Sequence, residues 1–185
     1  MSAMTKKMLS KSLLELLSKT TLDGITIHDI TDHADVSRKT FYYHFQDVYD
    51  LLEWTIREEM QKVVHGNDTK DTWTTGLLNT LKYCRANKDL VTNTFHSIKH
   101  KELEGYINEL IMPVIDDILK EQKGYSHVEE DDIDFIRKLY CYGITGLIMR
   151  WISDDLKTEP EYIVGKIEKF FTGSMTAMLS HADMN

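Results

Sequence analysis

The chain is poor in the residues that interrupt helices or build special sites. Its 185 residues include two cysteines, two prolines and nine glycines. Cys84 and Cys141 form no CxxC pair, so they suggest neither a disulfide framework nor redox or zinc chemistry. So few prolines and glycines leave few residues that would interrupt secondary structure, and the longer apolar patterns repeat at helical spacing. We therefore expect an all-α fold.

Other absences bear on location and on catalysis. No apolar run reaches the roughly 18 residues of a membrane span, and the polar start "MSAMTKK" lacks the apolar core of a signal peptide. We expect a cytoplasmic protein that does not enter the membrane. The sequence lacks GxSxG, GxxxxGK[ST] and a GxGxxG after a strand. We expect no enzymatic activity, no cofactor and no metal.

The charge is negative overall but unevenly placed. A formal net charge of -8 argues against a surface that binds nucleic acid throughout, although a local basic patch remains compatible with DNA binding. Residues 1–22 carry one acidic residue, Glu15, against four lysines: Lys6, Lys7, Lys11 and Lys19. Much of the acid lies elsewhere, notably in "HVEEDDID" (residues 127–134). The N-terminal region is therefore the place to look for a polyanion partner.

Three helices with short turns are expected in the first 50 residues. In "MLSKSLLELLSK", four leucines repeat at helical spacing as one apolar stripe: Leu9, Leu13, Leu16 and Leu17. Thr26, with Asp29 three residues later, predicts the start of a second helix, and Ser37 predicts the start of a third from about Arg38. This arrangement is typical of a helix-turn-helix unit packed on a leading helix.

The third of these helices, in "SRKTFYYHF" (residues 37–45), separates its apolar and polar residues. With about 100° per residue, Phe41 and Phe45 share one face, which we assign to the core. The polar residues avoid that face: Arg38, Lys39, Thr40, Tyr42, Tyr43 and His44. Such a surface suits a DNA major groove, with Arg38 reading a guanine edge and the hydroxyls meeting phosphates. A solvated amphipathic helix is the alternative on this pattern alone.

Residues 5–54 resemble the DNA-binding region of the TetR family of bacterial transcriptional regulators. The match rests on "ITIHDITDHADVSRKTFYYHFQDVYDLL", above all on residues 40–45. "YYHFQDVYDLLEW" also resembles the branch that contains activators of dihydroxyacetone kinase operons. The resemblance implies eight residues at the DNA: Thr26, Ser37, Arg38, Lys39, Thr40, Tyr42, Tyr43 and His44. The family often has a phosphate-binding lysine where this chain has Val48, so we expect phosphate contacts to depend more on Lys6, Lys7 and helix N-termini.

The remaining residues, 51–185, alternate apolar stripes with charge but carry no motif of comparable specificity. We expect a helical sensing and dimerisation domain here, joined to a helix-turn-helix domain of residues 1–50. The last two helices, about 131–155 and 160–182, are apolar on more than one face. In the family this pair forms a four-helix bundle with a second subunit. The residues expected at such an interface are Gly143, Gly146, Ile167, Phe170, Phe171 and Met175. Core helices of a monomer are the alternative.

Two further sets of residues are candidates for binding. Aromatic and sulfur-containing side chains suited to a ligand cavity are Trp73, Tyr83, Tyr106, Tyr140 and Met149. Packing within the core explains them equally well. His96 and His100 stand four residues apart on an expected helix, a spacing that can hold a metal, but a solvated polar face is the simpler interpretation.

These observations lead to a homodimeric regulator that binds a palindromic double-stranded DNA operator. Repression with release by an effector is the family's commoner mode, and the effector itself is not specified by the sequence. An activator controlled by a partner protein is the first alternative. A small-molecule binding or enzymatic helical bundle without DNA function is the remote one.

Overall fold

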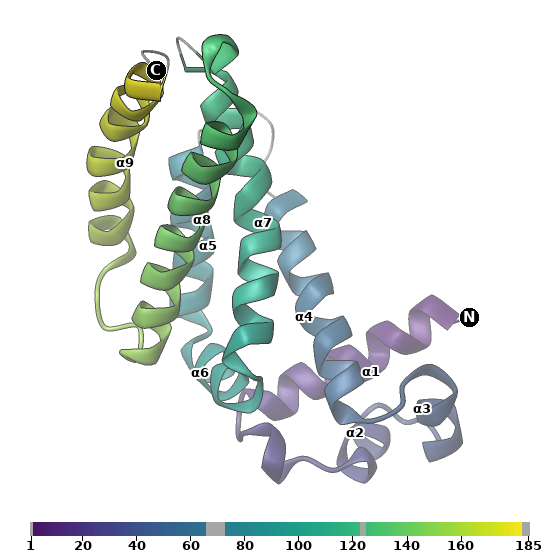
Figure 1. Cartoon of the computed structure of the whole chain (residues 1–185). Helices are drawn as coiled ribbons and strands as arrows, with labels where there is room; N and C mark the ends of the chain where they lie inside the picture. Colours follow the sequence, from purple (N-terminus) through teal and green to yellow (C-terminus); the bar gives the residue numbers. More distant parts are fainter. Residues whose placement is uncertain (1, 66–72, 123–124, 183–185) are drawn as a thin grey trace. The chain divides into compact units, whose positions relative to one another are not determined.

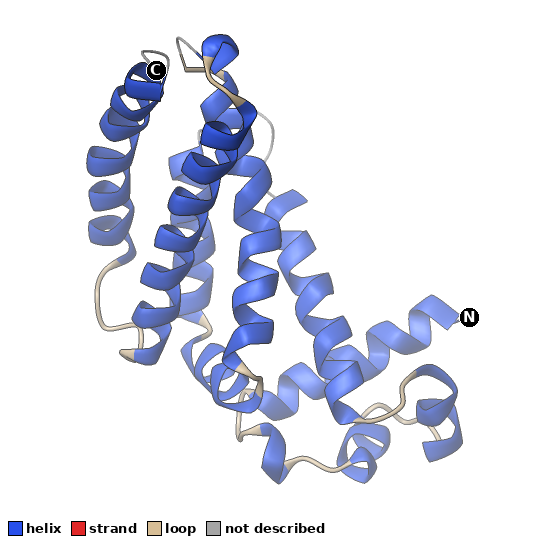
Figure 2. Cartoon of the chain, viewed as in Figure 1, coloured by secondary structure: helices blue, strands red, loops and turns tan. Residues whose placement is uncertain are grey.

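The computed structural model describes residues 2–65, 73–122 and 125–182, and over these ranges the chain forms helices and connecting turns without a strand (Figure 1 and Figure 2). The all-α prediction is confirmed. The α-helices described are α1 (Ser2–Leu17), α2 (Ile27–His33), α3 (Arg38–His44), α4 (Val48–His65), α5 (Trp73–Ala86), α6 (Lys88–Ser97), α7 (His100–Lys120), α8 (Glu130–Ser153) and α9 (Pro160–Ala182). Short 3-10 helices lie at η1 (Leu22–Gly24) and η2 (Tyr125–His127). None of the helices described combines the length and the apolar character needed to cross a membrane.

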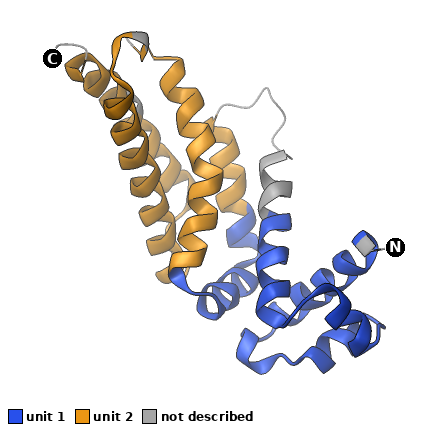
Figure 3. Cartoon of the chain, turned by 45° about the vertical axis from the view of Figure 1, so that its right-hand side comes forward, with its two compact units in different colours: residues 1–67, 83–100 blue, residues 68–82, 101–185 orange. Residues whose placement is uncertain are grey.

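Two compact units divide the chain (Figure 3). Unit 1 comprises residues 1–67 and 83–100, and unit 2 comprises residues 68–82 and 101–185. This division by packing differs from the expected boundary between residues 50 and 51. The division into a helix-turn-helix DNA-binding domain of residues 1–50 and a sensing and dimerisation domain of residues 51–185 stays a prediction.

Unit 1 is built around α1, which packs against α2, α3, α4 and α6. Three leucines of the expected stripe, Leu9, Leu13 and Leu17, are fully buried, and Phe41 of α3 is fully buried with them. The Ser12 hydroxyl donates a hydrogen bond to the Ile30 carbonyl at 2.9 Å, which ties α1 to α2. The small core therefore holds the helix-turn-helix elements in place.

The helix α6 belongs to unit 1 although it lies far along the chain. Asn93 donates its side-chain N–H to the carbonyl of Leu17, at the end of α1, over 2.8 Å. The backbone N–H of Leu22 in η1 donates to the Ser97 hydroxyl at 2.9 Å. Both bonds satisfy backbone groups close to the end of α1, where no further helical turn is available. Sequence reasoning missed this connection because the paired residues are 75 and 76 positions apart.

Unit 2 has its core between α7, α8 and α9. Members of this core include Ile115, Leu119, Ile136, Ile167 and Leu179, all buried, and residues of the first part of α5 pack against it. Salt bridges add a polar link, since Arg137 of α8 pairs with Asp116 of α7 and with Asp134 on its own helix. The positions of α8 and α9 confirm the two C-terminal helices expected from the sequence.

Candidate nucleic-acid interface

The cap of α3 confirms Ser37 as the residue that starts the helix. Ser37 has extended backbone angles, and its Oγ accepts the backbone N–H of Thr40 at 3.0 Å. The same oxygen lies 2.8 Å from Thr40 Oγ1. Because side-chain capping satisfies an N–H that the first helical turn leaves unpaired, it stabilises the start of α3. Ser37 and Thr40 thus hold each other in a defined arrangement at this end of the helix.

A reciprocal capping box starts α2. The backbone N–H of Thr26 donates to Asp29 Oδ2 at 2.8 Å, and the backbone N–H of Asp29 donates to Thr26 Oγ1 at 3.2 Å. The Thr26 hydroxyl also donates to Asp29 Oδ2 at 2.6 Å. These hydrogen bonds, led by the one from the Thr26 side chain, hold the pKa of Asp29 below its usual 3.8. The expected pairing of Thr26 with Asp29 is confirmed.

The turn between α2 and α3 depends on one residue in the left-handed region. Asp35 has a φ of 51°, which aspartate tolerates better than most residues other than glycine. The backbone N–H of Val36 then donates to the carbonyl of Thr31 at 3.0 Å, a bond typical of a helix C-terminus that ends in this conformation. The tight turn brings Ser37 directly after α2 and fixes where α3 begins.

The two faces of α3 are as expected from the sequence. Phe41 is 0% exposed and Phe45 is 3% exposed, whereas Tyr42 and Tyr43 are 60% and 81% exposed. Arg38 and Lys39 are also exposed, while Thr40 and His44 are half-buried. The exposed side therefore presents two cations and two phenol groups together, with apolar side chains on the inner side. Cations and hydroxyl groups on one helix suit both phosphate oxygens and base edges.

Aromatic rings hold one of the N-terminal lysines. The ammonium of Lys6 lies 5.1 Å from the centre of the Phe45 ring and 5.7 Å from that of Trp54. A cation over an aromatic face is attracted by the ring's negative charge distribution, which positions the flexible lysine. Lys11 instead lies 3.7 Å from the carboxylate of Glu15. Of the two, Lys6 is thus held next to Phe45, the residue that follows α3, and Lys11 forms an exposed ion pair within α1.

Comparison with protein families covers most of the chain. The family described as "Bacterial regulatory proteins, tetR family" matches residues 11–53, and "Transcriptional regulator C-terminal region", a TetR C-terminal family, matches residues 71–173. The second match alone spans more than half of the chain.

The chain belongs to the TetR family.

Two curated relatives carry related descriptions. The chain is 26% identical over 135 residues to the HTH-type dhaKLM operon transcriptional activator DhaS of Lactococcus lactis, covering 71% of this chain and 72% of that protein. It is 25% identical over 168 residues to the uncharacterized HTH-type transcriptional regulator YxbF of Bacillus subtilis, covering 88% of this chain and 43% of that protein. The TetR-family chain thus spans less than half the length of the second relative.

Solved structures support the same fold. The dihydroxyacetone kinase operon activator DhaS aligns with a TM-score of 0.69 at 21% identity, over 97% of both chains. A TetR transcriptional regulator from Streptococcus agalactiae aligns with a TM-score of 0.57 at 20% identity, over 90% of this chain and 94% of that one. The chain is a TetR-type transcriptional regulator with an N-terminal helix-turn-helix and a helical C-terminal domain.

The residues expected to line a ligand cavity lie in both units of this TetR-family regulator. Tyr106, Tyr140 and Met149 are buried in unit 2, and Trp73 packs against the core of that unit. The Tyr140 hydroxyl lies 2.7 Å from the Ser174 hydroxyl, and burial raises the pKa of this phenol. Tyr83 lies in unit 1 and is 44% exposed. The set is therefore divided between two environments, and its ligand role stays a prediction.

The residues expected at the dimer interface also fall into a buried group and an exposed group. Ile167 and Met175 are each 2% exposed and belong to the core of unit 2, while Phe171 is half-buried against Tyr140. Phe170, by contrast, is 57% exposed, and Gly143 and Gly146 are exposed on α8. The surface part of the expected set is thus Gly143, Gly146 and Phe170. Ile167 and Met175 face the chain's own interior because they fill the space between α9 and its neighbours.

The expectation that His96 and His100 share one helix is wrong. α6 ends at Ser97, Ile98 has extended backbone angles, and α7 begins at His100. The His100 ring instead lies 4.6 Å from the Phe95 ring, centre to centre. Over the ranges that the structure describes, no group of three or more His, Cys, Asp or Glu side chains is arranged to hold a metal.

The two thiols are poorly suited to nucleophilic chemistry. Burial raises the pKa of Cys84 to about 11, and it also raises the pKa of Cys141. A thiol reacts as its thiolate, so both groups are mostly unreactive at neutral pH. Cys141 lies beside Asn108, with Sγ 3.4 Å from the side-chain oxygen, and Thr145 donates to the same oxygen at 2.6 Å. These contacts connect α8 to α7 and are explained by packing.

Proposed function

We propose that this TetR-family regulator binds a palindromic operator as a homodimer, with the exposed side of α3 in the major groove of each half-site. The observation that carries the proposal is that α3 buries its apolar side chains and exposes its cations and tyrosines on the opposite side. Phe41 anchors the helix in unit 1, while Arg38, Lys39, Tyr42 and Tyr43 remain exposed around it. A recognition helix needs this combination, because base contacts require rigid support from behind.

Contacts to phosphate are assigned to groups around α3. The hydroxyls of Thr26 and Ser37 stand at the starts of α2 and α3, where the positive ends of the helix dipoles favour anions. Thr40, Tyr43 and His44 extend this surface along α3. Phosphate contacts orient the helix on the duplex, and Arg38 and Lys39 are left to read base edges.

Dimerisation is supported by a second apolar stripe on α8. Phe135, Leu139 and Tyr142 are 67%, 45% and 55% exposed at i, i+4 and i+7, and Gly146 continues the same line. α9 exposes Tyr162 and Phe170. Large apolar side chains in a continuous row are uncommon on a surface that faces only water. A second copy of the chain would cover the stripe through a two-fold, self-complementary interface.

Two modes of regulation are candidates for the dimer. The likeness to DhaS, described as an operon activator both among curated proteins and among solved structures, supports activation. In that mode a partner protein is the natural source of the signal. Repression with release by an effector is the second mode, as expected from the family resemblance of residues 40–45. In both modes the signal acts by changing the separation of the two α3 helices, which must match half-sites about 34 to 36 Å apart, or a multiple of that distance.

Operator binding is tested with DNA from upstream of the chain's own gene. Fluorescence anisotropy should show tight binding to one fragment and much weaker binding to a shuffled fragment of equal length. Tyr42→Ala should weaken specific binding at least about tenfold, the loss expected for about 1.4 kcal/mol. Tyr83→Ala removes an exposed tyrosine of α5 that lies on neither the α3 surface nor the proposed dimer interface, and it should leave operator affinity within about twofold.

Equal losses for the two tyrosine variants would contradict the assignment of α3 as the reading helix. Transcription of the bound promoter in a purified system then decides the mode. A rise in transcript on adding the regulator supports activation, and a fall supports repression.

A further inference from the structure

Two aromatic rings fix the position of Lys6 within unit 1. Its ammonium lies over the rings of Phe45 and Trp54, whose centres are 6.0 Å apart. Phe45 is buried and directly follows α3, whereas Trp54 is half-buried in the second turn of α4. Lys6 is therefore held in the region where α1 packs against both α3 and α4.

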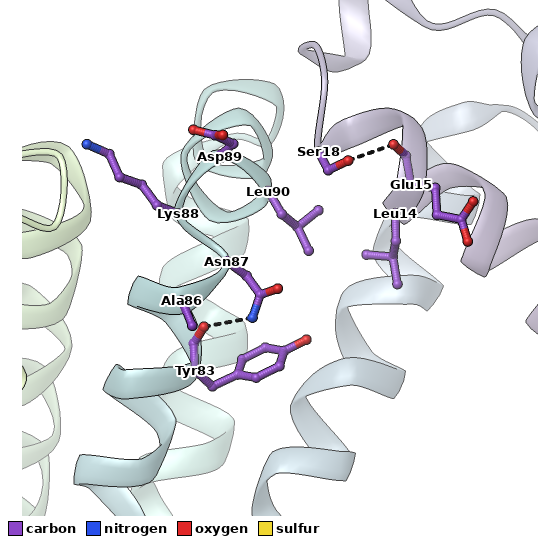
Figure 4. A pocket seen from close by; sticks show the side chains of 9 residues that line it. All are labelled: Leu14, Glu15, Ser18, Tyr83, Ala86, Asn87, Lys88, Asp89 and Leu90. Carbon is purple, nitrogen blue, oxygen red and sulfur yellow. Dashed lines mark hydrogen bonds between the residues drawn. The ribbon is translucent and has the colours of Figure 1, made fainter.

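The other end of α1 has different surroundings. Leu14 borders a hollow of about 470 Å³ between α1 and the junction of α5 with α6, and it faces Leu90 across that hollow (Figure 4). Glu15 points away from the hollow, and its Oε1 lies 3.7 Å from Lys11 Nζ. The charge of Lys11 is therefore partly balanced by a carboxylate of α1, whereas the charge of Lys6 lies over aromatic rings.

The start of α4 is occupied by the chain's own carboxylates. Asp47 Oδ1 accepts the backbone N–H of Asp50 at 2.9 Å, and Asp50 Oδ2 accepts the backbone N–H of Gln46 at 2.9 Å. A phosphate at this helix start would compete with both carboxylates and would be repelled by them. Of the groups expected to meet phosphate, the start of α4 is thus a poor choice. A contact on this side of α3 needs a cation from another helix.

Lys6 can supply that cation while it remains over the rings. A lysine ammonium has three N–H donors, so the donors that point away from the aromatic faces can bind phosphate oxygens. Lys6 is half-buried, which fits a covered apolar stem with the charge at the surface. Because the rings hold the side chain before DNA binds, less rotamer entropy is lost on binding.

We propose that Lys6 contacts a phosphate at the edge of the major groove that α3 enters, and that Trp54 is the positioning residue that holds Lys6 for this contact together with Phe45. Trp54 acts through Lys6 and not through the DNA. The phosphate contact rests on the proposed operator-binding function. The holding of Lys6 by the two rings stands without it.

The position of Lys6 is tested first in the absence of DNA, by NMR on the full chain with carbon-13-labelled lysine. Protons over the face of an aromatic ring resonate upfield, so the ε-methylene signal of Lys6 should lie upfield of those of Lys7 and Lys19, which are exposed. Trp54→Leu should move the Lys6 signal toward the other two. A Lys6 signal that coincides with that of Lys7 in the parent chain would overturn the arrangement.

Lys6→Met tests the phosphate contact. Methionine keeps an unbranched side chain on the rings and removes one cation from each subunit. For a dimer, the slope of log operator affinity against log salt should become shallower by about 1.8, and affinity at roughly 0.1 M salt should fall at least about tenfold. Lys7→Met, at the neighbouring exposed lysine, is the matched control and should change the slope by less than half as much. Equal changes in the two variants, or no change in Lys6→Met, would overturn the contact.

Trp54→Leu tests the positioning role, with urea unfolding used to refer each affinity to folded protein. The variant keeps every charge, so the salt slope should stay the same. Operator affinity should fall about fivefold or more, because Lys6 of each subunit would then lose rotamer entropy on binding. Trp54→Phe, which keeps an aromatic ring, should restore most of the affinity.

A double-mutant cycle shows whether Trp54 acts through Lys6. In a chain that already carries Lys6→Met, Trp54→Leu should lower operator affinity by under about twofold, since no cation remains to be positioned. Equal losses with and without Lys6→Met would overturn the positioning role. A chain that shows the upfield Lys6 signal but binds no DNA would contradict the proposed function, and the phosphate contact with it, and would leave the holding of Lys6 in place.

Discussion

The surfaces of α3 and of α8 with α9 both expose aromatic side chains, but their neighbours differ. On α3, Tyr42 and Tyr43 stand beside Arg38 and Lys39. On α8, Phe135 and Leu139 continue into an exposed glycine, Gly146. Aromatic rings with cations suit a polyanion, whereas aromatic rings with aliphatic side chains and glycine suit another apolar surface. The neighbours of an exposed ring, more than the ring itself, indicate the kind of partner.

Helix length gives a second contrast between these surfaces. α3 has seven residues, too few for a stable isolated helix, so it depends on the Ser37 cap and on burial of Phe41. α8 has 24 residues and buries one stripe in unit 2 while it exposes another. A change behind α3 should therefore unfold the elements that present its surface. A change on the exposed stripe of α8 should instead weaken dimerisation, and operator binding with it, without unfolding the chain.

The largest effect is expected from Phe41→Ala. Removing a fully buried phenylalanine costs about 3 to 5 kcal/mol, enough to unfold the elements around α3, while Tyr42→Ala should cost under about 0.5 kcal/mol. Circular dichroism with urea unfolding measures both variants. Similar destabilisation by the two would contradict the facing of α3. Such a result would also show that the inner and outer sides of α3 contribute equally to the stability of the fold.

Gly146→Glu tests the apolar surface of α8. A Cβ at Gly146 meets no heavy atom of the described residues within 4 Å, so the substitution should leave the folded chain intact. A charge buried without a partner at the proposed interface should raise the dimer dissociation constant at least about 100-fold, or about 2.7 kcal/mol. The mass measured by sedimentation should fall from that of two chains to that of one chain. A variant that remains dimeric would place the interface elsewhere.

Thr26→Ala separates folding from DNA contact at the start of α2. Loss of the cap should cost about 1 kcal/mol, because the N–H of Asp29 loses its side-chain acceptor. Urea unfolding measures this cost. Thr26→Ser, which keeps the hydroxyl, is the matched control. If operator affinity falls in Thr26→Ala by more than the loss of folded protein accounts for, the result supports a direct contact between Thr26 and a phosphate.

The same cap predicts a pH dependence. The pKa of Asp29 is lower in the folded chain than its usual 3.8, so the carboxylate stabilises the fold above that pH. Its contribution should disappear as the pH falls through the lowered pKa. Asp29→Asn should therefore be less stable than the parent chain at pH 6, and the difference should narrow below about pH 4. A difference that stayed constant from pH 6 to pH 3 would show that the carboxylate charge does not stabilise the cap.

The smallest effect on folding is expected from Lys39→Ala, because this side chain is exposed. A dimer would lose two cations, and a phosphate role predicts that the slope of log affinity against log salt becomes shallower by about 1.8. If Lys39 instead reads a base edge, the loss of affinity should be confined to one base pair in each half-site, and the preference for that base pair should weaken. Affinities for the operator and its variants at several salt concentrations distinguish the roles. No change in either quantity would remove Lys39 from the interface.

Local features of the fold followed directly from the sequence. The caps at Thr26 and Ser37 involve residues three apart, and the faces of α3 follow from the angle between successive residues. These interactions close within one turn of helix, so the identities of neighbouring residues are enough to predict them. The family resemblance rested on the same stretch, and the comparisons confirm it.

Long-range packing decided the rest. α8 and α9 are apolar on more than one face, and composition alone could not tell that Ile167 and Met175 point into the core while Phe170 remains exposed. The division of the expected cavity residues between units, and the break between His96 and His100, also depend on where each helix packs.

The sequence by itself thus determined where the helix-turn-helix elements begin and which side of α3 is inward, because both depend on contacts within a few residues. Only the tertiary structure decided that α6 joins unit 1 through Asn93 and Ser97. Only the tertiary structure, too, placed Leu14 and Leu90 on opposite walls of one hollow. Contacts between residues more than 70 positions apart depend on the complete packing of the chain, which no local pattern encodes.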